Sequence, residues 1–155
     1  MALRFSTKLA NDALGVTGLA QALADGVIYI YSGTQPADPD LGATGTLLGI
    51  VTQDAAAWAA GAATNGLEFG TPAARSIAKA SAENWKFLGL ADGVAGWFRQ
   101  VGNATDDPTT NSAILPRLDG SIGKTSGDLR LNNIDIVTSA PHTVDTYQID
   151  LFNKA

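Results

Sequence analysis

The chain has 155 residues, a length typical of one domain with its own core, and its lack of cysteine excludes disulfides and thiolate zinc sites. Its 10 Lys and Arg against 15 Asp and Glu give a net charge of -5 without any basic cluster, so no nucleic-acid partner is expected. No segment has the apolar length of a signal peptide or a membrane span, so no membrane partner is expected either.

The charged residues are unusually few. They make up 16% of the chain, against roughly 25% in an ordinary domain, while glycine is frequent at 17 residues. Monomeric proteins usually have a hydrated surface that is rich in charged residues such as Lys and Glu. A surface of small neutral residues therefore indicates permanent contact with other subunits in an assembly. The alternative interpretation is a monomer with few surface charges.

Residues 1–25 are expected to form a helical segment or arm ahead of the main domain. Ser6 can cap a first turn over residues 8–14, Gly15 interrupts it, and Thr17 can cap a second piece over residues 18–24. Apolar side chains share a face in each piece, so both must dock on something: either the protein's own sheet or a neighbouring subunit. For the second alternative, the candidate interface residues are Leu3, Phe5, Leu9, Leu14, Leu19 and Leu23.

Residues 26–155 are expected to form a single β domain. The runs 26–32 and 46–52 are the clearest strands, and the first is apolar on both faces, which predicts that both are covered. Proline and aspartate mark residues 33–45 and 102–116 as long surface loops. Asp92-Gly93 separates two apolar, aromatic runs, 85–90 and 94–101, and this pattern predicts a hairpin.

Shorter strands are expected at 117–122, 128–132, 134–137 and 143–152, which brings the total to about eight or nine strands with regular turn signals. There is no alternation of strands and helices to indicate a parallel sheet. The predicted fold is mainly β: an antiparallel β-sandwich or jelly roll with a short helical N-terminal segment.

No catalytic, metal or cofactor site is expected. His142 is the single histidine, lies beside Pro141 in a predicted turn and has no second histidine or cysteine to work with. Gly123-Lys124-Thr125 resembles the end of a phosphate-binding loop, but Leu118 stands where its first glycine is needed.

Two acidic pairs, Asp38 with Asp40 and Asp106 with Asp107, could offer oxygens to calcium, but aspartate beside proline is ordinary turn chemistry.

The three tryptophans have different expected roles. Trp85 and Trp97 lie in predicted strands and are expected to be buried, whereas Trp58 lies in an alanine-rich loop. Trp58 is therefore a further candidate interface residue, because tryptophan is enriched among the residues that dominate binding energy.

Several segments together resemble a family of small virion structural proteins of tailed bacteriophages. They are the start at residues 3–7 and the phrases at 26–37, 90–99, 117–123 and 126–129. The resemblance runs over nearly the whole chain. Its motifs are structural and not active-site signatures, so the resemblance implies no catalytic residue in this chain.

The resemblance implies a place in the virion, and the favoured role is a capsid decoration, or cement, protein on the outer capsid surface. The implied partners are the major capsid protein and further copies of the chain, as a dimer or trimer, after synthesis in the host cytoplasm. Residues 2–25 are the first candidate contact, followed by the loops 33–45 and 102–116. The alternatives are a tail, neck or baseplate component, and a carbohydrate-binding host-attachment module that uses Trp58 or Trp97.

Overall fold

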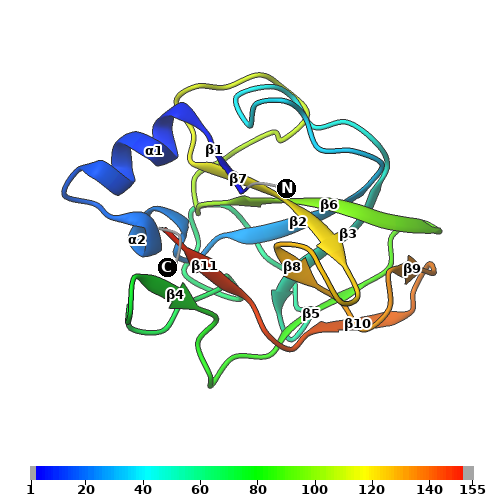
Figure 1. Cartoon of the computed structure of the whole chain (residues 1–155). Helices are drawn as coiled ribbons and strands as arrows, with labels where there is room; N and C mark the ends of the chain where they lie inside the picture. The colour runs from blue at the N-terminus through cyan, green and yellow to red at the C-terminus, as the bar shows by residue number, and fades with distance from the viewer. Residues whose placement is uncertain (1–2, 152–155) are drawn as a thin grey trace.

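The computed structural model describes residues 3–151 of the chain. Two short helices near the N-terminus lie beside a mainly antiparallel β body (Figure 1), which confirms the predicted fold class. In chain order the elements are β1 (Arg4–Phe5), α1 (Thr7–Leu14), α2 (Leu19–Leu23), β2 (Val27–Ser32), β3 (Leu47–Gln53), β4 (Ser76–Ala78), β5 (Trp85–Leu88), β6 (Gly93–Val101), β7 (Arg117–Gly123), β8 (Leu129–Arg130), β9 (Asp135–Ile136), β10 (Pro141–Val144) and β11 (Gln148–Asp150). No helix described between residues 3 and 151 is long and apolar enough to cross a membrane.

One large sheet folds around the core. Its strand order is β1-β7-β6-β2-β3-β5-β10, with β8 added to β7 in parallel and β9 added to β6, while β4 and β11 form a separate ribbon. The first residues of β6 pair with β9, and the rest of β6 pairs with β2 and β7. Strand β10 pairs with β5 at one edge of the sheet, and β9, which comes directly before β10 in the chain, pairs with β6. The sheet therefore curves round so that β10 returns toward β6, and the apolar interior is enclosed.

Strand β2 is buried on both faces, as its sequence predicts. Ile28 and Ile30 enter the main core, which is filled by aliphatic and aromatic side chains from the sheet and both helices. On the opposite face, Tyr31 stacks on Trp97 of β6 with ring centroids 4.6 Å apart. Trp97 and Trp85 are both buried, which confirms their prediction.

The predicted hairpin between residues 85–90 and 94–101 is wrong. Strand β5 pairs with β3 and β10, whereas β6 pairs with β2 and β7, so that β2 and β3 lie between β6 and β5 in the sheet. The connecting residues cross the end of β3, where the Leu90 N–H donates to the Leu48 carbonyl at 2.9 Å. Asp92 accepts hydrogen bonds from the Thr138 N–H and hydroxyl at 2.7 and 2.8 Å instead of closing a two-residue turn.

Candidate interaction surfaces

Two long irregular loops, residues 33–45 and 102–116, pack against each other over the sheet, and together we call them the loop platform. The Ala43 N–H donates to the Pro108 carbonyl at 2.7 Å, and the Ser112 N–H donates to the Asp40 carbonyl at 2.7 Å. The Asn111 side chain accepts from the Gly42 N–H at 2.9 Å. Each loop therefore satisfies part of the other's backbone, as buried peptide groups require.

A buried ion pair fixes the second loop to the sheet. Arg99 of β6 donates through Nε and Nη2 to the two carboxylate oxygens of Asp119 of β7, both at 2.7 Å, and both side chains are 0% exposed. Its remaining Nη1 donates to the Pro108 carbonyl at 2.9 Å. Burial raises the pKa of the Asp119 carboxyl, and the hydrogen bonds and positive charge of Arg99 oppose that rise.

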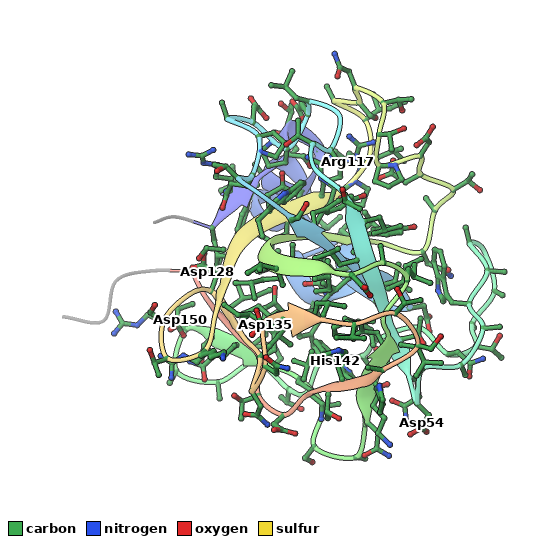
Figure 2. The ribbon with its side chains drawn as sticks, turned by 90° about the vertical axis from the view of Figure 1, so that its right-hand side faces the viewer. Asp54, Arg117, Asp128, Asp135, His142 and Asp150 are labelled. Atoms are coloured by element: carbon green, nitrogen blue, oxygen red, sulfur yellow. The ribbon has the colours of Figure 1, made fainter. Side chains whose placement is uncertain are left out.

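Arg117 at the start of β7 performs the same task for both loops (Figure 2). Its guanidinium forms a two-pronged ion pair with Asp106 and donates to the carbonyls of Thr110 at 2.9 Å, Asp107 at 3.1 Å and Pro39 at 3.4 Å. Burial favours a lower pKa for Arg117, but the hydrogen bonds and charge of Asp106 outweigh it and raise that pKa. The guanidinium therefore stays charged while it holds three backbone carbonyls.

These anchors give the platform a fixed shape without regular secondary structure. Its outer side presents apolar side chains, with Leu41 43% and Ile114 79% exposed. Helix α1 is tied to the same surface, because Thr7 donates through its N–H and hydroxyl to the Asp40 carboxylate at 3.0 and 2.6 Å. Loops held in one conformation lose little conformational freedom on binding, so the platform is preorganised.

The proline and aspartate pattern predicted these loops from the sequence, but it did not indicate the charged residues that anchor them. A usable signal was present, since Arg99 follows Trp97 and Phe98 in an apolar, aromatic run, and Arg117 and Asp119 lie in a predicted strand. Charges in covered strands must be paired with each other or with backbone groups.

The N-terminal segment packs on the protein's own sheet, so the sheet-capping alternative describes it. Ser6 caps α1 by accepting from the Leu9 N–H at 3.2 Å, and its hydroxyl donates to the Leu115 carbonyl at 3.0 Å. Three of the six candidate interface residues in this segment, Leu9, Leu19 and Leu23, lie in the core. Their side chains are thus not exposed to a neighbouring subunit in this structure.

The other three candidates differ. Leu3 and Phe5 are partly buried and pack against the core, where β1 pairs with β7. Leu14, at the end of α1, is 89% exposed. The structure therefore separates Leu14 from the other five residues as a side chain open to solvent.

Trp58 is half-buried. Its Nε1 donates to the Asp25 carbonyl at 2.8 Å, which attaches the loop after β3 to the end of the N-terminal segment. The exposed part of the ring keeps Trp58 as a contact candidate. Trp97 is 1% exposed, so it has no free face for a sugar ring.

His142 is half-buried and lies in β10, which corrects the expectation of a turn. Its ring stacks on Phe87 with centroids 4.9 Å apart, and burial lowers its pKa. Among the described residues, no Ser or Cys side chain forms a hydrogen bond with the His142 ring.

The acidic pairs have structural partners. Asp38 accepts from the Asp40 N–H at 2.9 Å, Asp106 is paired with Arg117, and Asp107 accepts from the Thr109 N–H and hydroxyl at 3.0 and 2.7 Å. These two hydrogen bonds, the hydroxyl first, lower the pKa of Asp107. Between residues 3 and 151, no three His, Cys, Asp or Glu side chains gather in a metal-binding group.

No protein-family model, curated protein or solved structure matches this chain.

Proposed function

We propose that this chain is a non-enzymatic structural protein of a tailed-phage virion, and specifically a capsid decoration protein. In this role it binds the outer surface of the major capsid protein and stabilises the assembled shell. The resemblance of its sequence phrases to small virion proteins supports the virion location. The observation that carries the proposal is the loop platform, an irregular surface that buried arginines hold in one shape.

The platform has the properties that binding to a fixed lattice needs. Long loops without secondary structure are uncommon in compact domains unless they serve binding or another function. Its apolar contacts at Leu41 and Ile114 lose little strength in salt, whereas exposed ion pairs are screened.

Stabilisation of the shell follows from mass action. A protein that binds the assembled state and not the separated subunits stabilises that state by about 2.7 kcal/mol per site when its free concentration is a hundred times Kd. Many weak sites on one shell therefore add to a large effect.

The test is to add the purified protein to decoration-free expanded capsids, and to measure both sedimentation with the particles and the capsid melting temperature. We expect binding and a higher melting temperature. Leu41→Asp and Ile114→Asp should weaken binding, because each places a charge in the apolar contact. Thr125→Asp, at an exposed turn after β7, is the matched control and should bind like the unmodified chain.

No binding to capsids would overturn the proposal. Binding to purified tails or baseplates, and not to capsids, would move the protein to the alternative location in the virion. If Leu41→Asp and Ile114→Asp both bind capsids as tightly as the unmodified chain does, the contact lies elsewhere on the chain.

A further inference from the structure

An exposed apolar patch lies at the end of the molecule where β5 ends and β6 begins, and we call it the end patch. It comprises Leu88, Leu90, Val94 and Val137, each 49–55% exposed. Backbone pairing joins the segments that carry these residues: Gly89 pairs with Thr138, and Val94 pairs with Asp135 of β9. These side chains point away from the core, since their neighbours Phe87, Ala95 and Ile136 are the buried ones.

The end patch has an acidic rim. Asp135 is exposed on β9, and Asp92 lies in the turn between β5 and β6. Hydrogen bonds from the Thr138 N–H and hydroxyl lower the pKa of Asp92, so this carboxylate is charged at neutral pH. Figure 2 views the molecule from this end, with Asp135 on the near strand.

An apolar groove of about 510 Å3 lies between the two helices and the β4–β11 ribbon. Its floor and walls include Ala20 of α2, Ala73 and Ile77 around β4, and Ile149 and Leu151 around β11. A volume of this size is within the roughly 300–1,000 Å3 of ordinary binding pockets.

The rim of the groove adds exposed apolar surface and a positive charge. Leu14, at the end of α1, and Val16, in the turn that follows, are 89% and 105% exposed and are next in sequence to Ala13 and Thr17 of the groove lining. Leu151, which lines the groove, is 44% exposed. Arg75 lines the same groove. Within residues 3–151, neither Arg75 nor Asp135 forms an ion pair.

The two surfaces are complementary and lie at opposite ends of the molecule. In Figure 1 the turn between α1 and α2 and strand β4 are on the left, and β9 is on the far right. One end is apolar with an acidic rim, and the other is an apolar groove with a basic side chain. In a second copy of the chain, the basic groove offers a positive charge to the acidic rim of the end patch, and the end patch offers negative charges to the groove.

We propose that copies of this chain associate head to tail, with the end patch of one copy seated in the groove of the next. The contact is heterologous, so repetition gives a closed ring if the rotation closes and an open filament if it does not. The Arg75 guanidinium then faces the carboxylates of Asp92 and Asp135. This inference concerns self-association and goes beyond the proposed attachment to a capsid.

The test uses two variants that each block one end. Val94→Lys places a positive charge in the end patch, where it meets Arg75, and Leu151→Glu places a negative charge in the groove. Both native side chains are exposed, so circular dichroism and thermal melting should match the unmodified chain. In sedimentation velocity, the unmodified chain should form species larger than a monomer as its concentration rises, and each variant alone should remain monomeric.

Mixing the two variants distinguishes this contact from a symmetric one. The Val94→Lys copy keeps an intact groove and the Leu151→Glu copy keeps an intact end patch, so the mixture should associate through these two ends and form a dimer. A charge swap adds a second test: Arg75→Glu and Asp135→Lys should each weaken association, and the double variant should recover it.

An unmodified chain that stays monomeric at every concentration would overturn the inference. So would self-association that survives in either blocking variant, or a mixture that yields no dimer. These outcomes are separate from the capsid test, because the blocking variants leave the loop platform unchanged. A monomer that still binds capsids would defeat this inference alone, and an oligomer that ignores capsids would defeat the proposed function alone.

Discussion

The substitution Asp119→Asn tests the anchor on which the loop platform depends. It leaves the guanidinium of Arg99 buried, with no exposed surface and without a negative partner. Removing one member of a buried ion pair typically costs about 3–5 kcal/mol, because the remaining charge is uncompensated. A domain has only about 5–15 kcal/mol of stability, so we expect a large fall in the urea midpoint.

The double variant Arg99→Met/Asp119→Leu separates the charge from the anchoring. Replacing a buried pair with apolar residues of similar volume is often neutral or stabilising, so most of the lost stability should return. The Pro108 carbonyl nevertheless loses one of its two donors, Arg99 Nη1, and keeps the Ala43 N–H. We therefore expect faster amide hydrogen exchange across residues 102–116 in the double variant, with the sheet amides protected as before.

Urea unfolding followed by tryptophan fluorescence is a suitable assay, because Arg99 lies 5.6 Å from the Trp97 ring centroid. The control is Asp54→Asn, which removes an exposed partner of Lys86 at 3.5 Å. An exposed pair of this kind is worth about 0–1 kcal/mol. If Asp119→Asn costs no more than Asp54→Asn, the pair is accessible to water and the reasoning about a buried anchor is refuted.

Three further predictions follow from burial. Leu9→Ala should cost about 2–5 kcal/mol in urea unfolding and Leu14→Ala less than about 0.5 kcal/mol, whereas equal costs would contradict the docked helix. Gly96→Ala should cost about 1–3 kcal/mol, because its Cβ would lie 2.1 Å from the Gly33 carbonyl oxygen, and an unchanged midpoint would contradict that contact. Burial lowers the pKa of His142 below its usual 6.5, so its contribution to stability is complete above pH 6.5 and is lost as the pH falls toward the lower native value. The urea midpoint of the unmodified chain should therefore fall in mild acid more than that of His142→Phe, and identical pH profiles would contradict the effect of partial burial on His142.

Local sequence was sufficient for the strands with strong patterns. The β-branched and aromatic residues of 26–32 predicted β2 and its two covered faces, because a strand that is apolar on both sides must be buried on both sides. The buried positions of Trp85 and Trp97 followed from the same reasoning.

Pairing between distant segments was not available from local patterns. Asp92-Gly93 looked like a hairpin turn, but Thr138 binds Asp92, and β5 finds its partners in β3 and β10. Strand β1 has two residues and pairs with β7 more than a hundred positions away, so no periodicity could reveal it. The buried charges of the platform were visible as residues, but their partners depended on the fold.

The low charge of the chain and the shape of its surface have a common explanation. Two buried ion pairs hold the loops in place, Arg99 with Asp119 and Arg117 with Asp106. Because these four charged side chains are buried, the exterior is still less charged than the composition alone indicates. In Figure 1 the loop platform lies along the top, between the end patch and the groove. Head-to-tail contacts would occupy the two ends and leave the platform of every copy uncovered. A row or ring of such copies would then present many preorganised platforms to a repeating surface, where weak individual contacts act together.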